Sequence, residues 1–424
     1  MTKGYPSYRA SGIAWMPKIP AHWETVPLKR SFRILSGATP RSSIAEYWDG
    51  DIVWITPADY KTQDKYIRKG ARNITPEGYS SCSTNMIPRG SIIFSKRAPI
   101  GTVAINDVEL CTNQGCLSCI PLKNVPATYY YYLLSAFTDI FEAHASGSTF
   151  KEISATTFGN IKLPIPPREE QEQIVRFLDW KVSAIDKLIA TYKKEITCLE
   201  ELSQAQIDTT ISHLASNPSI LKKLKRITAC NRSTLDESTP YDYLFRYVDI
   251  SSVDAKHGIT HYEKTVFGKS PSRARRIVHK DDLIVSTVRT YLRAIAKIED
   301  DDNVIVSTGF AVITPQNVDS GYLECLFKSN LFCDEVVRRS IGVSYPSINT
   351  SALMDISVPI PSFDTQIDIG KRLTAQRKKI NRYIEYKKQQ ISNLNELKTR
   401  LISDAVTGKI DVRSIKLPNF AKEE

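Results

Sequence analysis

The sequence predicts an α+β protein with an internal pseudo-two-fold repeat, in which two globular mixed α/β domains are joined by two long antiparallel helices that form a coiled coil. The first observation behind this prediction is a repeat, because the sequence around residues 147–202 returns roughly 195 residues later without a gap. The second is a heptad-like spacing of apolar residues over two segments far longer than an ordinary helix. The third is a series of short apolar runs, bounded by turn residues, ahead of each of those segments.

Two short motifs make the repeat visible. Gly147–Ile153 (GSTFKEI) returns as Gly342–Ile348 (GVSYPSI), and Ile161–Pro166 (IKLPIP) returns as Ile356–Pro361 (ISVPIP). The segments that follow these motifs share further residues at the same offset, including Gln171 with Gln366, Ile174 with Ile369, and Ile185 with Ile380. A repeat of this length indicates that each half of the chain is one structural unit.

This repeat divides the chain into five predicted segments. They are an N-terminal arm with a first globular domain at residues 1–166, a first long helix at 167–215, a second globular domain at 216–361, a second long helix at 362–408, and a C-terminal tail at 409–424.

The globular domains are expected to begin with an arm and to continue with short strands. Residues 1–27 interleave aromatic residues with Pro, so we expect an irregular segment packed on the surface of a domain. Apolar runs predict strands in the first domain at residues 51–55, 91–95, 101–105 and 116–121, followed by a helical stretch at 128–143. The second domain repeats this order, with strands at 245–250, 282–286, 295–298 and 307–315, and a helical stretch at 322–337.

The two long helices are predicted by periodicity and by their ends. From Val175 to Leu199, apolar residues recur at alternating spacings of three and four, and Glu and Lys fill most positions between them. Pro167 suits the first helical position, Ser362 suits an N-cap, and Gly408 suits the residue after a last turn. Each helix would have ~45 residues and a length of about 65–70 Å. An apolar seam of that length requires a partner, so we expect the helices to pair with each other, although Arg377 and Lys387 interrupt the second seam.

Composition limits the class of protein and its compartment. The net charge is +11 and the sequence pI is about 9.1, which favours an anionic partner. No signal peptide and no apolar run of membrane-spanning length are present, so we expect a cytoplasmic protein without a membrane partner. Cys116 and Cys119 form a CxxC pair, but no second pair and no nearby His accompany them, so we expect no metal site. His257 and His261 lie in polar surroundings that indicate a loop.

Motifs for catalysis are missing from the sequence. We find neither the Asn/Asp-Pro-Pro-Tyr/Phe motif of amino-methyltransferases nor the GxxxxGK(S/T) motif of nucleotide-binding proteins. Glu385 and Lys387 have a nuclease-like spacing, but they lie in a predicted helix with no partner Asp-Pro motif upstream, which favours a solvated helix face. We therefore predict no catalytic residues and no cofactor.

Several motifs of this sequence are typical of one protein family. They lie at the start of the chain, at the junctions and in both helices. They are Ser11–Trp15, Ile19–Glu24, Leu163–Gln171, Asp179–Ile189 and Leu401–Asp411. Together with the order globule, helix, globule, helix, they resemble the specificity subunit of type I restriction–modification systems over essentially the whole chain. The second junction departs from this pattern, because Ser362–Gln366 lacks the acidic pair present at Glu169 and Glu170.

The resemblance implies two target recognition domains, each of which reads one half of a bipartite sequence in double-stranded DNA. It also implies that the specificity subunit is not catalytic. Two modification (methyltransferase) subunits would dock on the spacer helices, and ATP-dependent restriction subunits would join through the complex. S-adenosylmethionine, ATP and magnesium would then be bound by these partners.

Reading DNA requires basic side chains on loops that a rigid scaffold holds in place. Such residues follow matching strands in the two domains, and second basic clusters lie nearby. The candidate DNA-binding residues are Lys96, Arg97, Lys61, Arg68 and Lys69 in the first domain, and Arg289, Arg293, Arg273, Arg275, Arg276 and Tyr345 in the second. Ser148, Phe150 and Tyr345 lie beside Gly147 and Gly342, and they either face DNA or seat the domain on its helix.

Two other classes of function remain open from the residues alone. The chain could be a single-component methyltransferase or nuclease fragment, or a coiled-coil assembly protein that does not read DNA. Sequence-specific methylation that requires both this chain and a separate methyltransferase distinguishes the specificity subunit from both.

Overall fold

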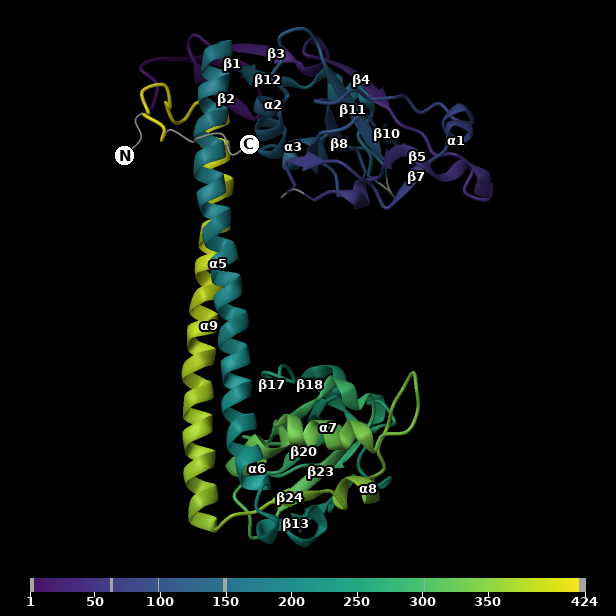
Figure 1. The fold of residues 1–424 in the computed structure, drawn as a ribbon, viewed down its shortest axis with the longest axis vertical. Helices are drawn as coiled ribbons and strands as arrows, with labels where there is room; N and C mark the ends of the chain where they lie inside the picture. Colours follow the sequence, from purple (N-terminus) through teal and green to yellow (C-terminus); the bar gives the residue numbers. More distant parts are fainter. Residues whose placement is uncertain (1–3, 62–63, 98, 148–150, 301, 419–424) are drawn as a thin grey trace. The chain divides into compact units, whose positions relative to one another are not determined.

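The computed structural model of this chain describes residues 4–61, 64–97, 99–147, 151–300 and 302–418, which form two compact units (Figure 1). The first unit comprises Met1–Thr191 and Gln390–Glu424, and the second comprises Tyr192–Gln389. Each unit contains one mixed α/β domain and about half of each of two long helices, α5 (Arg168–Ala215) and α9 (Phe363–Val406). The predicted fold class is therefore confirmed.

The domain of the first unit is built on a five-stranded sheet. Its strand order is β4 (Phe32–Ser36), β11 (Cys116–Pro121), β8 (Ile92–Ser95), β9 (Val103–Asn106) and β6 (Tyr66–Ile67). All neighbours are antiparallel except β9 and β6. Successive side chains of a strand point to opposite faces of the sheet. On one face, Ile92 and Phe94 of β8 pack in a cluster with apolar residues of α2 (Ala127–Ser135) and α3 (Thr138–Ala143). On the other face, Ile93 packs in a separate cluster with Ile55.

The remaining elements of this domain form a smaller sheet and the connection to α5. The three-stranded sheet has the order β10 (Cys111–Thr112), β5 (Trp48–Ile55) and β7 (Arg72–Ile74), and β10 runs parallel to β5. After β7 comes α1 (Pro76–Ser80). Helix α4 (Ala155–Asn160) and strand β12 (Lys162–Ile165) then lead directly into α5.

The domain of the second unit repeats this plan. One sheet has the order β14 (Thr228–Cys230), β23 (Phe310–Pro315), β20 (Leu283–Ser286) and β21 (Ile295–Lys297), and the other has the order β18 (Glu263–Val266), β15 (Leu244–Val248), β22 (Val304–Ser307) and β19 (Ala274–Ile277). Two strand pairs accompany them, β16 (Val253–Asp254) with β17 (Gly258–Ile259), and β13 (Leu221–Lys223) with β24 (Ser357–Pro359). The helices are α6 (Ser320–Phe327), α7 (Asn330–Arg338) and α8 (Thr350–Met354). Strand β15 pairs in parallel with β22, as β5 does with β10.

The prediction of an irregular N-terminal arm is wrong. Strands β1 (Tyr8–Ile13) and β2 (Met16–Pro20) form an antiparallel hairpin, and β3 (Glu24–Pro27) pairs with β12. The physical reason is that the partner of β3 is supplied by a segment far along the chain, which local patterns do not reveal. The expected packing of the arm on the domain is observed, because Ile19 and Trp23 are buried in its core.

The two long helices have the predicted apolar seams and antiparallel pairing. Leu178, Ile185 and Ile189 of α5 are buried, as are Leu373, Ile380 and Ile384 of α9. In the first unit the Nζ atom of Lys398 lies 2.7 Å from Asp186, and in the second unit the Nζ atom of Lys387 lies 2.7 Å from Glu195. Residue numbers rise along α5 as those of the partners in α9 fall, so the helices are antiparallel. Within the described residues, no helix is apolar over a length that would cross a membrane.

The two ends of the chain both contact the first turns of α5. The buried carboxylate of Glu170 accepts hydrogen bonds from Tyr5 and from the Nε1 atom of Trp23, the latter at 3.0 Å. From the other end, Val412 is buried, and its carbonyl accepts a hydrogen bond of 3.2 Å from Gln173. Residues 409–418 therefore pack on the first unit, although they follow the second long helix.

Candidate nucleic-acid interface

The most regular feature shared by the two domains is the turn that follows the central strand of the main sheet. After β8, the Ser95 hydroxyl donates to the Arg97 carbonyl at 2.8 Å, and the Lys96 amide donates to the Gly115 carbonyl at 2.9 Å. After β20, Ser286 donates to Val288 at 2.6 Å and Thr287 donates to Gly309 at 2.8 Å. The same hydrogen bonds thus fix the backbone of the candidate basic loop in both units.

Residues of the repeated glycine motif form β-bridges beside this turn in both units. Ser146 bridges to Glu152 in the first unit, and Ile341 bridges to Ser347 in the second. Gly342 begins its hairpin with a φ of 110°, a conformation that a side chain would disfavour. The same motif is joined to the strand-end turn by the bridges Arg97–Glu152 and Val288–Ser347. The motif found by sequence comparison therefore lies beside the strand-end turn in each domain, and in the second unit it forms a short hairpin. Ser148 and Phe150 lie outside the described residues.

In the first unit, the two basic residues of the turn differ in exposure. Lys96 is buried, and its Nζ atom lies 2.8 Å from Glu152, whereas Arg97 is exposed and its Nε atom lies 2.6 Å from the other oxygen of the same carboxylate. Desolvation opposes ionisation of Glu152, but the hydrogen bonds from Lys96 and Arg97 outweigh it and lower the pKa of the carboxyl. Lys96 thus holds Glu152 beside the turn, and Arg97 is the residue that faces solvent.

The second basic group of this unit is exposed and lies on the loops around β6. Lys61, Arg68 and Lys69 are all exposed. The Nε atom of Arg68 lies 2.7 Å from Asp107, and hydrogen bonds from Arg68 and Arg89 lower the pKa of that carboxyl. Arg89 extends this surface, and sequence reasoning missed it because no predicted strand precedes it.

In the second unit, three candidate residues converge on one hollow. The hollow has a volume of about 640 Å³ and is lined by Arg273, Arg289 and Tyr345, together with Asp249 and Ser251. The guanidinium carbon of Arg289 lies 5.1 Å from the centre of the Tyr345 ring, which is a cation–π contact. The site therefore combines two cations, an aromatic face and one carboxylate. The sequence analysis did not select Asp249 and Ser251. The only signal for them was the predicted strand at 245–250, which has a counterpart in the first domain.

Two of the three other candidates of this unit, Arg293 and Arg275, have side-chain partners within the protein. Arg293 lies 2.5 Å from Asn330 and 2.9 Å from Asp334, so it braces α7. Arg275 donates to the Ala274 carbonyl and its guanidinium lies over Phe267 at 4.7 Å. Arg276 is partly buried in β19, and among the described residues its Nε atom has no hydrogen-bond partner. These three arginines do not line the hollow.

The hairpin of the second unit also carries exposed apolar side chains that sequence reasoning did not select. Val343 at its tip is fully exposed, and Ile341 is largely exposed. They are next to Tyr345, so a partner that reaches the hollow meets apolar as well as cationic groups.

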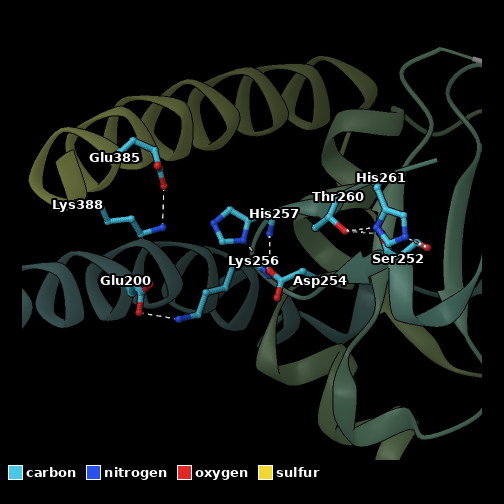
Figure 2. A network of polar contacts seen from close by, with 9 residues as sticks. All are labelled: Glu200, Ser252, Asp254, Lys256, His257, Thr260, His261, Glu385 and Lys388. Atoms are coloured by element: carbon cyan, nitrogen blue, oxygen red, sulfur yellow. Dashed lines mark hydrogen bonds and ion pairs between the residues drawn. The ribbon is translucent and has the colours of Figure 1, made fainter. Parts of the chain in front are cut away.

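The cysteines and histidines do not form a metal site among the described residues. Burial raises the pKa of Cys111 to about 11 and that of Cys116 to about 12, which disfavours the thiolate that a metal or a nucleophile requires. Figure 2 shows His257 beside Asp254, and His261 beside Ser252 and Thr260, so each histidine has its own polar neighbours.

Comparisons with known proteins agree on one family. A family model described as the type I restriction modification DNA specificity domain matches residues 20–198 and again residues 230–393. The MjaIX specificity subunit of a type I restriction enzyme from Methanocaldococcus jannaschii is 39% identical over 189 residues, which cover 44% of this chain and 43% of that protein. This match thus spans less than half of the relative. The MjaVIII specificity subunit from the same organism is 23% identical over 94% of this chain and 95% of its own length.

Solved structures support the same fold. A chain from a study of complex assembly and conformational transition of the type I restriction–modification system has a TM-score of 0.74, with 13% sequence identity, and the match covers 92% of this chain and 99% of that one. The HsdS subunit from Thermoanaerobacter tengcongensis has a TM-score of 0.53 at 15% identity, and the match covers 92% of this chain and 98% of that one.

Proposed function

The chain belongs to the type I restriction–modification DNA specificity family, and from this premise we propose that it reads a bipartite sequence in double-stranded DNA, one half-site per globular domain. The observation that carries the proposal is the strand-end turn with the β-bridges that join it to the glycine motif, which occurs in both units with the same backbone hydrogen bonds. A sequence that is read in two halves requires two such readers, and direct readout requires basic side chains held on a rigid scaffold.

We assign different roles to the candidate residues according to their contacts. Arg97 in the first domain, and Arg289 and Arg273 in the second, suit contacts to base edges, because a guanidinium can bind guanine with two hydrogen bonds. Lys61, Arg68 and Lys69 suit phosphate contacts, which position a protein without reading sequence. Tyr345 holds the Arg289 guanidinium over its ring. Lys96, Arg275, Arg276 and Arg293 support these loops from within the protein.

The proposal also covers boundaries, partners and compartment. We propose residues 1–166 and 216–361 as target recognition domains, residues 167–215 and 362–408 as spacer helices on which two modification subunits dock, and residues 409–424 as a C-terminal tail. Restriction subunits would join through that complex in the cytoplasm. The chain itself would bind neither S-adenosylmethionine nor ATP, and it would contribute recognition and scaffolding but no catalytic residue.

Replacing both Arg273 and Arg289 with Ala should disturb recognition of one half-site only. We expect a loss of about 1–3 kcal/mol for each base contact removed, and Arg97→Ala should have this effect on the other half-site. The measurement is sequencing of methylated adenines in cells that carry each variant with the methyltransferase subunits of the same system. Arg338→Ala is the matched control, because this exposed arginine pairs with Glu335 on its own helix. A variant that alters both half-sites equally, or neither, contradicts the assignment.

The isolated chain should not bind S-adenosylmethionine, because the sequence contains no methyltransferase motif. Isothermal titration calorimetry of the chain with S-adenosylmethionine should give no binding heat. The same titration with the chain and its methyltransferase subunits together is the positive control. Micromolar binding by the chain alone would be evidence for a single-component enzyme.

A further inference from the structure

Two lysines at matching positions of the repeat both contact α5. Lys65 follows Trp54 by the same number of residues as Lys256 follows Phe245, and Trp54 and Phe245 begin matching segments of the two domains. Lys65 forms an ion pair with Asp179, and Lys256 forms an ion pair of 2.6 Å with Glu200. Each contact joins a loop of a domain to the long helix within the same unit.

The contact of Lys65 has several partners. Its ammonium lies 5.0 Å from the ring centre of Tyr132, 5.8 Å from that of Tyr66 and 5.9 Å from that of Tyr131. The Tyr132 hydroxyl donates to the same Asp179 oxygen at 2.5 Å, so the carboxylate receives a charged and a neutral donor. The Lys65 carbonyl accepts from the Ile105 amide at 2.9 Å, which ties this residue to the main sheet.

The contact of Lys256 is simpler and more exposed. Figure 2 shows Lys256, on the loop that follows β16, beside Glu200 of α5. The Asp254 carboxylate accepts from the amides of Lys256 and His257 at 2.8 and 2.9 Å, which fixes the shape of this loop. The Lys256 side chain is 60% exposed, so solvent weakens its ion pair.

These lysines provide a second attachment between each domain and α5. In the first unit, Ile174 and Leu178 of α5 are already buried in the core of the domain, and Asp179 is the next residue. In the second unit, Ile207 and Ile211 are buried in the core, and Glu200 lies about two turns before Ile207. The ion pairs attach a separate loop of each domain to α5, in addition to the core, and attachment through two parts of the domain defines its orientation on the helix.

We propose that Lys65 and Lys256 are positioning residues that fix the orientation of each domain on α5, and thereby make the chain selective for one spacing between the half-sites. The inference rests on the proposed function. A displacement of a reading loop by about 3.4 Å corresponds to one base pair, so a small change of orientation is enough to admit a neighbouring spacing. Neither lysine is required to contact DNA.

The first test measures spacing directly. Lys65→Met and Lys256→Met are expressed with the methyltransferase subunits of the same system, on a plasmid library whose half-sites are separated by every spacing around the native one. We expect unchanged half-sites, and a rise of about threefold to tenfold in methylation at neighbouring spacings for Lys65→Met, as expected from the loss of cation–π and ion-pair contacts. Lys256→Met should have a smaller effect, because its contact is exposed. The charge exchange Lys256→Glu with Glu200→Lys should restore the native profile.

The controls remove lysines that do not join a domain to α5. Lys181 lies over Trp180 on the same helix at 3.8 Å, and Lys388 pairs with Glu385 within α9, as Figure 2 shows. Lys181→Met and Lys388→Met should keep the native spacing profile. Loss of bases from one half-site in Lys65→Met or Lys256→Met would overturn the inference, because it would indicate direct contact with DNA.

The second test does not depend on DNA. Nitroxide labels are placed on cysteines introduced at Lys123 of the first domain and Lys187 of α5, both exposed, with Cys82, Cys198 and Cys230 replaced by Ala. Double electron–electron resonance should give a broader distance distribution for Lys65→Met than for the parent and for Lys181→Met. An equally narrow distribution would overturn the positioning role. If the wild-type chain directs no sequence-specific methylation, the proposed function fails, and this distance measurement still decides the role of Lys65.

Discussion

Replacing Glu324 with Gln should lower the free energy of unfolding of the second unit by about 3–5 kcal/mol, the usual cost of breaking a buried ion pair from one side. Glu324 is a buried residue of α6, and its Oε1 atom lies 3.0 Å from Lys328 and 2.6 Å from Arg377 of α9. The variant leaves two cations without their counter-charge, and only 10% of the Lys328 side chain is exposed. Arg377, which interrupts the apolar seam in the sequence, is thus explained by this partner.

The tryptophans allow the change to be located. All five lie in the first unit, namely Trp15, Trp23, Trp48, Trp54 and Trp180. We expect far-UV circular dichroism to show an earlier denaturant transition for Glu324→Gln, while tryptophan fluorescence shifts less. Glu335→Gln is the control, because this carboxylate pairs with Arg338 and Arg339 near the surface, where an ion pair contributes about 0–1 kcal/mol. A variant with the wild-type circular dichroism transition would contradict the expected cost.

The same carboxylate predicts a dependence on pH. Desolvation would raise the pKa of Glu324, but Lys328 and Arg377 outweigh it and lower the pKa from 4.5 to about 2. A carboxyl group with a depressed pKa stabilises the folded state above its unfolded pKa, and this contribution is lost as the pH falls toward the folded value. The wild-type chain should therefore lose stability between pH 4.5 and about 2 more steeply than Glu324→Gln, in denaturation curves recorded across that range.

Lengthening both long helices by four residues should change the spacing that the chain accepts and leave the half-sites unchanged. The insertions belong after Ala190 and after Ser392, because these positions lie midway between the ion pairs Asp186–Lys398 and Glu195–Lys387. Four residues add about 6 Å and rotate the helix by ~40°, and one base pair corresponds to about 3.4 Å. We expect a spacing longer by one or two base pairs, measured by sequencing of methylated adenines.

An insertion in one helix alone is the matched control for this experiment. It moves the apolar seam of that helix past the seam of its partner, so buried residues such as Ile189 and Ile380 lose their packing. This variant should be destabilised and inactive. An active double insertion that kept the original spacing would show that the helices do not set the distance.

The long helices could be predicted because their signal is local and long. Val175 to Leu199 carries the seam in consecutive turns, and the structure places continuous helices there. The strand-end turns could be found for the same reason, since each follows an apolar run of β8 or β20.

What could not be predicted depends on partners far away in the sequence. The sequence does not show that Lys96 pairs with Glu152, because the two residues meet only after the chain has folded back. Arg293 is likewise tied to Asp334, and β3 finds its partner only in β12. The ion pair of Lys65 with Asp179 was likewise not predictable, because nothing in the sequence near Lys65 indicates that partner. Predicting the roles of these side chains therefore required the tertiary structure, whereas predicting the architecture did not.

The composition of the first unit has a consequence for synthesis on the ribosome. The unit combines residues that precede the second unit with residues from Gln390 onward, and these emerge only after the whole second unit. The second unit is a continuous stretch, Tyr192–Gln389, and it can close while the seam of the first half of α5 is still uncovered. Apolar residues such as Ile185 would then remain exposed until the residues from Gln390 onward have emerged, and such surfaces are prone to aggregation. Chains that stall or terminate shortly after residue 389 should thus be selective clients for chaperones, with an intact second unit and an unfinished first one.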